Sequence, residues 1–379
     1  MPTCSIKPRH LVVPLLLAAA LAACAKGDDV ATTDSASAMV DTTGAPARAP
    51  AGDMSPASPD DEMKAVLDQF AALGPKPIET LTPAEARKQP TPADAVKALL
   101  GKQGKPTAPE AVGSVVNRSI AGPGGQIPIR IYTPKGDGPF PVVFYIHGGG
   151  WVIANLDVYD ASPRAIANAA NAVVVSTHYR QGPEHKFPAA HDDVYAAYKW
   201  VVANAGSLKG DTSRIGIVGE SAGGNMAAAT AMQARDKGDK LPAHMVLIYP
   251  VASADTATPS KRAYVAAKPL STPMMAWFGK HYFKTPADAM DPRINLVAAD
   301  LKGLPSATII RAQIDPLLSE GEQLADRLRA AGVDVNDKTY EGAAHEFFGM
   351  GAVDEDAKDA VKMAADGLKK GFDRVGKAP

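Results

Sequence analysis

Apolar strand-like segments alternate with helix-like segments from about residue 60 to the end of this chain. Strands separated by helices favour a largely parallel sheet with helices on both faces, because each parallel connection has to cross over the sheet. We therefore predict an α/β fold. The expected strands cover 114–120, 127–133, 142–147, 172–178, 215–218, 245–251, 307–312 and 333–340, and the expected helices cover about 159–170, 191–205, 222–235, 320–331 and 355–375.

Three further helical segments are expected before the first strand. Apolar residues recur at helical spacing from about Asp60, and two Thr-Pro pairs, at Thr82 and Thr91, look like capped helix starts with proline in the first turn. Between two of the later strands, residues 252–300 show no clear period, and we expect this stretch to be irregular.

A serine lies where one expected strand turns into a helix. Gly219-Glu220-Ser221-Ala222-Gly223 fits the G-x-S-x-G pattern, in which small neighbours let the serine adopt an exposed, strained turn. The pattern alone is weak, and the strand before it and the helix after it give it its weight. The amino terminus of that helix would direct backbone N–H groups at a reacting carbonyl oxygen.

A glycine-rich loop, His147-Gly148-Gly149-Gly150-Trp151, follows an earlier strand. Its backbone amides, with the amide of Ala222, would form an oxyanion hole. A phosphate-binding loop is less favoured, because no Lys-Ser/Thr follows the glycines and no G-x-G-x-x-G opens the next helix.

A serine nucleophile needs a base and an acid that orients the base. Asp315 directly follows a late strand, and His345, the last of eight histidines, lies in a loop between the last strand and the last helix. Along the chain the three residues occur in the order Ser, Asp, His, which is the order expected when the serine lies in a G-x-S-x-G turn between a strand and a helix. We expect His244 and His281 to be packing or surface groups. No second histidine completes a zinc-binding spacing with His345.

Charge and cysteine content exclude several classes of function. The 40 Lys and Arg residues balance 41 Asp and Glu residues, for a net charge of −1, which argues against nucleic-acid binding. The only two cysteines are Cys4 and Cys24. The remainder of the chain therefore has no disulfide, no thiolate nucleophile and no cysteine metal site.

The amino terminus reads as an export signal. Residues 11–23 form an apolar run after Lys7 and Arg9, too short to span a bilayer. It ends in Leu21-Ala22-Ala23-Cys24, which resembles the lipobox of bacterial lipoprotein precursors. That resemblance implies a signal peptide over 1–23, lipidation at Cys24, and a location in the cell envelope, with outer-membrane anchoring facing the periplasm or the exterior. A plain secretory signal is the alternative. Residues 24–60, poor in large apolar side chains, are expected to be a disordered tether to a domain over 61–379.

Taken together, the motifs resemble those of the bacterial hormone-sensitive-lipase-like esterases, a branch of the α/β-hydrolase superfamily. The resemblance covers about residues 60–375. It implies Ser221 as nucleophile, Asp315 as acid, His345 as base, and oxyanion donors from Gly148, Gly149, Gly150 and Ala222. It also implies a helical cap built from about 61–105 and 252–300. Gln181-Gly182 and Ser319 depart from the family pattern without touching the three triad positions. The pieces that carry the resemblance are His147–Trp151, Gly219–Gly224, Tyr179-Arg180, 183–190, Asp291-Pro292-Arg293 and Asp315-Pro316-Leu317.

The expected activity is hydrolysis of short-acyl or small soluble carboxylic esters through an acyl-enzyme, with no metal and no cofactor. An amidase or deacetylase using the same triad remains open, and so does an inactive, lipid-tethered binding protein. The acidic and histidine residues of 183–193 are expected to be structural rather than metal ligands. The apolar cluster in 274–283 is expected to be buried, or in part to line an acyl pocket.

Overall fold

The computed structural model of the protein describes residues 54–375. The predicted signal peptide, Cys24 and most of the predicted tether lie outside the described residues. The end of the predicted tether, residues 54–60, does not behave as a disordered segment. Met54 packs against the core, and the amide of Ala57 donates a hydrogen bond to the hydroxyl of Tyr264 over 3.3 Å. The folded body therefore starts earlier than residue 61, and the predicted boundary was placed too late.

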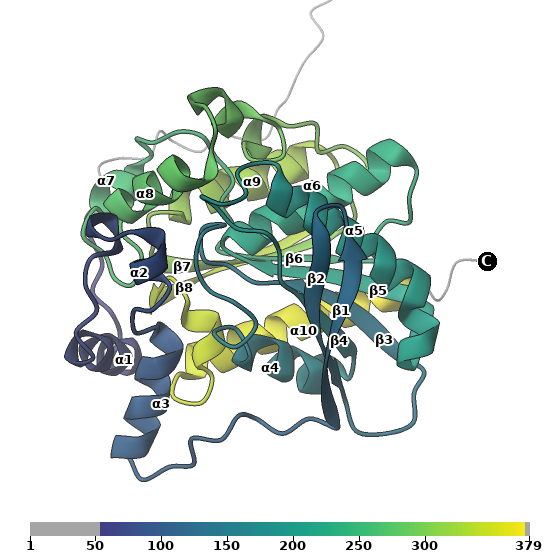
Figure 1. The fold of residues 1–379 in the computed structure, drawn as a ribbon, viewed down its shortest axis with the longest axis horizontal. Helices are drawn as coiled ribbons and strands as arrows, with labels where there is room; N and C mark the ends of the chain where they lie inside the picture. The colour runs from purple at the N-terminus through teal and green to yellow at the C-terminus, as the bar shows by residue number, and fades with distance from the viewer. Residues whose placement is uncertain (1–53, 376–379) are drawn as a thin grey trace, which may run out of the picture. The chain divides into compact units, whose positions relative to one another are not determined.

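A single eight-stranded sheet organises the described chain (Figure 1). Its strands are β1 (Ser114–Gly122), β2 (Gly125–Thr133), β3 (Phe140–Ile146), β4 (Val173–Thr177), β5 (Gly210–Glu220), β6 (Met245–Ile248), β7 (Ala307–Ile314) and β8 (Val335–Ala344). Their order in the sheet is β1-β2-β4-β3-β5-β6-β7-β8. Only the pairs β1–β2 and β2–β4 are antiparallel, so the predicted, mostly parallel α/β sheet is confirmed.

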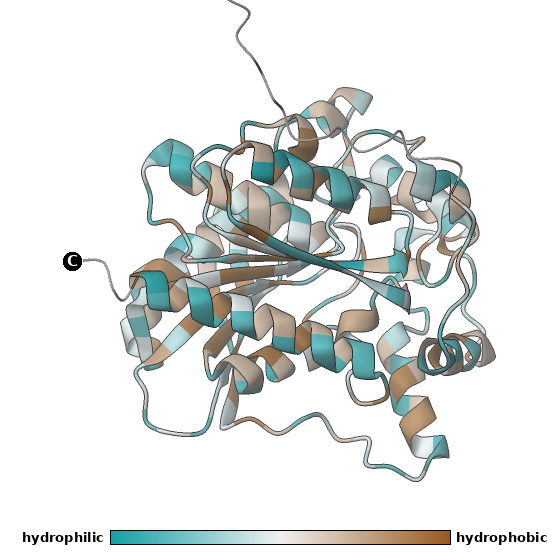
Figure 2. Ribbon diagram, turned by 180° about the vertical axis from the view of Figure 1, so that it is seen from behind, coloured by the Kyte–Doolittle hydropathy of each residue, from teal (hydrophilic) through white to brown (hydrophobic). Residues whose placement is uncertain are grey.

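Helices cover both faces of the sheet. In β3, Val142, Phe144 and Ile146 belong to one apolar core, and Val143 and Tyr145 belong to the other, as the two-residue period of a doubly covered strand requires. The helices α5 (Ala189–Asn204), α6 (Ala222–Lys237) and α9 (Leu318–Ala330) pack on the first core, and α4 (Ala161–Ala170) and α10 (Glu355–Val375) on the second. Figure 2 shows helices above and below the sheet that carry both hydrophilic and hydrophobic residues.

The segments before β1 and after β6 contribute short helices. The first group is α1 (Asp61–Ala72), α2 (Pro83–Ala86) and α3 (Pro92–Lys102), and the second is α7 (Pro259–Ala263) and α8 (Thr272–Tyr282). Capping boxes at Thr82 and Thr91 confirm the two predicted helix starts. The indole of Trp277 donates a hydrogen bond to the carbonyl of Leu81 over 3.0 Å, so the two segments predicted to form the cap contact each other.

Several element boundaries differ from those predicted. β5 starts at Gly210 rather than 215 because its first half, which includes Asp211 and Arg214, is polar, only partly buried and carries no apolar signal. β6 ends at Ile248 rather than 251, since Tyr249 has a positive φ of 34°. The pattern of 252–300 predicted an irregular stretch, whereas the family resemblance implied cap helices there; the stretch contains α8, an eleven-residue helix. In the part of the chain that is described, no helix combines the length and apolarity needed to cross a bilayer.

Candidate active site

Ser221 lies in the sharp turn between β5 and α6, with φ 55° and ψ −119°. This backbone region is strained for a residue with a side chain and recurs at functional sites. The flanking glycines are required by close approach. A Cβ on Gly219 would lie 2.1 Å from the carbonyl oxygen of Gly223, and a Cβ on Gly223 would lie 2.1 Å from that of Ile146. Any side chain larger than that of glycine at position 219 or 223 would therefore clash with the backbone of this turn.

His345 and Asp315 reach Ser221 from two neighbouring parallel strands. Asp315 follows β7 and His345 follows β8, so both emerge at the carboxyl edge of the sheet. The Nε2 atom of His345 lies 3.0 Å from Ser221 Oγ, and its Nδ1 atom lies 2.7 Å from Asp315 Oδ2. The other carboxylate oxygen of Asp315 accepts a hydrogen bond from the amide of Leu317 over 2.8 Å. The structure thus brings all three predicted residues into one hydrogen-bonded chain.

The electrostatic surroundings of His345 favour its protonated form. Burial alone would lower the pKa of this imidazole, but the carboxylates of Asp315, Glu346 and Glu220 together outweigh that effect. The pKa of His345 is therefore raised above its ordinary value. A neutral histidine with a raised pKa is a stronger base than a free imidazole.

The glycine loop after β3 lies beside Ser221. Gly149 and Gly150 adopt positive φ values of 91° and 57°, and both line the cavity that contains Ser221 and His345. A Cβ on Gly149 would lie 2.3 Å from the carbonyl oxygen of Ile153, so this position requires glycine. Gly148 lies behind the cavity wall, where an added Cβ would be 3.1 Å from Ser221 Cβ.

The loop turns its carbonyls into the protein. The carbonyl of Gly148 accepts a hydrogen bond from the Tyr179 hydroxyl over 2.8 Å, and that of Gly149 accepts from the amide of Val152. Among residues 54–375, the amides of all four predicted donors, Gly148, Gly149, Gly150 and Ala222, donate to no other protein group. These amides are thus available to bind an oxyanion, and of the three loop glycines Gly149 and Gly150 line the cavity.

His147 anchors the loop, a role that the motif alone did not reveal. Its Nδ1 atom lies 2.9 Å from the carbonyl oxygen of Gly148, and its Nε2 atom lies 3.0 Å from His178 Nδ1. Burial, assisted by His178, lowers the pKa of His147 to about 3, so the side chain stays neutral at physiological pH. It therefore holds the loop by neutral hydrogen bonds rather than by charge.

A cavity of about 510 Å³ opens over Ser221. Its walls come from both predicted cap segments and from the glycine loop, and its apolar lining includes Leu67, Phe70, Ile78, Met274 and Phe278. Of the predicted apolar cluster in 274–283, Trp277, Phe278 and Tyr282 are buried, and Met274 and Phe278 line the cavity. Burial is therefore confirmed for three members of the cluster, and the role of its cavity-lining members in binding an acyl group stays a prediction.

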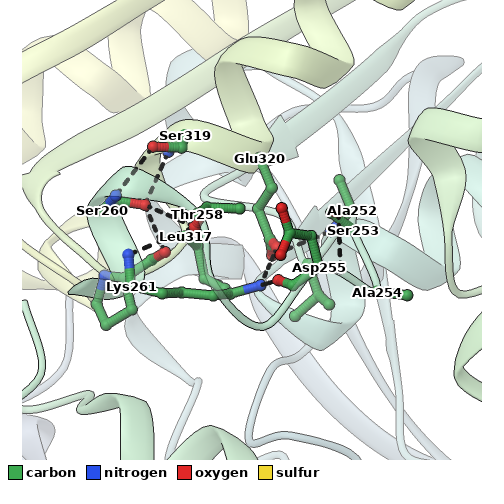
Figure 3. Close-up of polar contacts among 12 residues, drawn as sticks. Ala252, Ser253, Ala254, Asp255, Thr258, Ser260, Lys261, Leu317, Ser319 and Glu320 are labelled. Carbon is green, nitrogen blue, oxygen red and sulfur yellow. Dashed lines mark hydrogen bonds and ion pairs between the residues drawn. The ribbon is translucent and has the colours of Figure 1, made fainter. Parts of the chain in front are cut away.

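The loop that carries Asp315 is fixed by contacts with α7 that the sequence did not reveal (Figure 3). The hydroxyl of Ser260 donates to the carbonyl of Pro316 over 2.7 Å and accepts from the amide of Ser319 over 3.1 Å. Lys261 Nζ lies 2.7 Å from Glu320 Oε2, and both side chains are buried. Burial raises the pKa of Glu320, and the Lys261 ammonium opposes this rise. The chain that directly follows Asp315 is thus tied at Pro316, Ser319 and Glu320 to the segment that follows β6.

Two residues of the segment 183–193, His191 and Asp193, make contacts within the fold. His191 is buried and bonds to the Tyr282 hydroxyl and to Asn225, while Asp193 forms an ion pair with Arg180 over 2.8 Å. His244 is also buried, between the hydroxyls of Ser306 and Thr308. Within residues 54–375, no cluster of histidine, cysteine and acidic side chains is arranged to hold a metal ion.

Known proteins share this architecture and part of this sequence. Residues 143–349 match a family described as the alpha/beta hydrolase fold. The ethyl acetate hydrolase of Pseudomonas putida is 33% identical to this chain over 301 residues, which cover 78% of this chain and 92% of that protein. The arylesterase of Saccharolobus solfataricus is 36% identical, over 59% of this chain and 74% of its own length.

A solved structure agrees with these matches. The hyperthermophilic esterase from the archaeon Pyrobaculum calidifontis superposes with a TM-score of 0.76 at 36% identity, covering 83% of this chain and 98% of that one. The similarity therefore extends over nearly the whole of that enzyme.

Proposed function

This chain belongs to the hormone-sensitive-lipase-like branch of the α/β-hydrolase fold family and is a serine carboxylic-ester hydrolase, and we propose that Ser221 is its nucleophile. The observation that carries this proposal is the hydrogen-bonded chain from Ser221 Oγ through His345 to Asp315. In that chain, His345 can remove the proton of the Ser221 hydroxyl as the oxygen attacks. An isolated serine has no such base beside it.

In the proposed mechanism, His345 Nε2 takes the Ser221 proton while Oγ attacks the ester carbonyl carbon. Asp315 holds the imidazole with its Nδ1 proton directed at the carboxylate and stabilises the imidazolium that forms. The amides of Gly149, Gly150 and Ala222 bind the developing oxyanion. His345 then donates its proton to the departing alcohol, which leaves an acyl-enzyme. Water, deprotonated by His345, releases the carboxylic acid and restores Ser221.

We propose small, soluble esters with short acyl chains as substrates. The cavity over Ser221 is roofed by residues of both cap segments, a geometry that suits single molecules better than an emulsified lipid surface. The names of the relatives support the same class, since one hydrolyses ethyl acetate and another is an arylesterase.

The Ser221→Ala variant, assayed with p-nitrophenyl acetate and butyrate, tests the nucleophile. Turnover should fall to background while thermal unfolding stays close to that of the unmodified protein. Unchanged turnover would sink the assignment. A panel of p-nitrophenyl esters from C2 to C16, extended to anilides and acetylated sugars, tests the substrate class. Higher kcat/KM on the anilides or sugars than on the short esters would instead identify an amidase or a deacetylase.

We further propose that the protein is exported as a lipoprotein acylated at Cys24. The support is the sequence Leu21-Ala22-Ala23-Cys24 at the end of an apolar run. Expression in a bacterial host with an alkyne-labelled palmitate should label the full chain and place it in the membrane fraction. The Cys24→Ala variant should lose both the label and the membrane association. Equal labelling of the two proteins would refute the proposal.

A further inference from the structure

Glu346, the residue directly after His345, has an unusual backbone conformation. Its φ is 72°, in the left-handed region that glycine occupies without strain and that other residues rarely adopt. Strain of this kind persists where the surrounding structure enforces it, and it often accompanies function. The carboxylate that this conformation places must therefore be considered together with its neighbours.

The side chain of Glu346 points to the catalytic imidazole. Its Oε1 atom lies 3.8 Å from Nε2 of His345, and the Tyr159 hydroxyl donates a hydrogen bond to the same oxygen over 2.6 Å. Glu346 also lines the cavity over Ser221, and its side chain keeps 22% of its surface exposed. Asp315 approaches the opposite edge of the ring, at Nδ1. The imidazole therefore lies between two carboxylates.

A third carboxylate, that of Glu220, is buried in the protein near His345. Glu220 is fully buried and accepts hydrogen bonds from the hydroxyls of Tyr145 and Tyr249. The ring of Tyr249 packs against His345, with centroids 4.5 Å apart. Within the described chain, no lysine or arginine forms an ion pair with Asp315, Glu220 or Glu346. Among the described residues, a protonated His345 is therefore the only cation that pairs with Asp315 and Glu346.

We propose that Glu346 is a second electrostatic partner of the catalytic imidazole, stabilising the imidazolium from the Nε2 side. The inference rests on the proposed function, in which the proton taken from Ser221 resides on Nε2. Glu346 acts through His345 and is a positioning residue. Tyr159 fixes its carboxylate, and the left-handed backbone aims it. Positive charge appears on the ring only as the transition state forms, so a nearby fixed carboxylate lowers the barrier.

The pH profile of the enzyme follows from this arrangement. His345 must be neutral to act as a base, so activity falls as the pH drops through its pKa. An ionised Glu346 raises that pKa, because it stabilises the charged ring. Removal of its charge must therefore lower the pKa of His345 and extend activity to more acidic pH.

The Glu346→Gln variant tests the proposal, since it keeps the side-chain length and an acceptor for Tyr159. The acid limb of the kcat/KM profile for p-nitrophenyl acetate should move down by at least about 0.8 pH unit, the shift that a unit charge 3.8 Å away gives when it is screened as in bulk water. The plateau should fall by about threefold to tenfold. Glu341→Gln, which removes an exposed carboxylate on β8, is the matched control and should leave the profile unchanged.

A second variant separates charge from folding. Glu346→Gly relieves the left-handed strain but leaves the Tyr159 hydroxyl without its acceptor, so the two effects on stability oppose each other, and the variant should still show the same shift of the acid limb. A profile that coincides with the unmodified one in both variants would overturn the role of Glu346. If Ser221→Ala were inactive while both profiles stayed unshifted, only this inference would fail. If Ser221→Ala were active, the proposed nucleophile would fail first.

Discussion

Lys261 Nζ lies 2.7 Å from Glu320 Oε2 at a point where the two side chains are only 4% and 0% exposed. Glu320 also accepts a hydrogen bond from the amide of Ala252 over 3.2 Å. Glu320 follows Asp315 by five positions, and Lys261 belongs to the segment after β6. One buried pair therefore joins the loop of the proposed catalytic acid to the chain that roofs the site.

Replacement of Lys261 by methionine should destabilise the fold strongly. The substitution leaves Glu320 buried without its counter-ion, a change that typically costs about 3–5 kcal/mol. Urea unfolding should show this loss, and adding Glu320→Gln should recover part of it, because the unpaired charge is then removed. Lys64→Met, in the exposed pair Lys64–Asp68, should change stability by no more than about 0.5 kcal/mol. Equal effects at the two sites would contradict this reading.

Glu220 should make stability depend on pH. Burial, and next the nearby Glu346, raise the pKa of Glu220 to about 7 in the folded state, from 4.5. The folded protein then binds the proton more tightly than the unfolded chain, so stability falls as the pH rises between these two values, by at most about 3 kcal/mol. Glu220→Gln should flatten this dependence when unfolding free energies at pH 5 and pH 8 are compared. Parallel pH dependences in the two proteins would contradict the assignment.

Gly149→Ala should disable the oxyanion loop. The new Cβ would clash with the carbonyl oxygen of Ile153 and would sit on a backbone with φ 91°. Loss of one oxyanion donor typically lowers kcat by about 10²–10³-fold. Gly332→Ala is a matched control, because Gly332 has φ 83° with nothing within 4 Å of the added atom. The control should lose some stability but keep its kcat/KM; a comparable loss of activity in both variants would argue against the loop.

Phe278→Ala should lengthen the acyl chain that the cavity accepts. The ring lines the cavity and lies against Gly150, so its removal opens space beside Ser221. If two more methylenes are buried, the ratio of kcat/KM for hexanoate over butyrate esters should rise by about tenfold. Phe283→Ala, which removes a ring packed on Trp151 outside the cavity lining, should leave the ratio unchanged. An unchanged ratio in Phe278→Ala would mean that acyl chains bind elsewhere.

The sequence predicted those features that depend on local patterns. The alternation of strands and helices predicts the α/β sheet, and the turn at Ser221 follows from the glycines on either side of it. Asp315 and His345 could be placed because each directly follows an apolar strand, and adjacent parallel strands end at the same edge.

The features that were missed depend on contacts between distant segments. Lys261 and Glu320 are 59 positions apart, and neither lies in a recognisable motif. In the sequence, Glu346 is noticeable only as the residue after His345, where no second histidine completes a zinc-binding motif. No sequence pattern predicts its left-handed backbone conformation. The first half of β5 was missed for a simpler reason, because a polar, partly buried strand segment has no apolar period to detect.

The reciprocal bonds between Ser260 and Ser319, with the ion pair beside them, also limit how this protein can be recombined. A chimera that exchanged only residues 252–300 for the roof of a relative would leave Glu320 facing a foreign side chain and Ser319 without its partner. The unit that can be exchanged between relatives is therefore discontinuous in sequence. Residues 252–300 and the first turn of α9 must be transferred together.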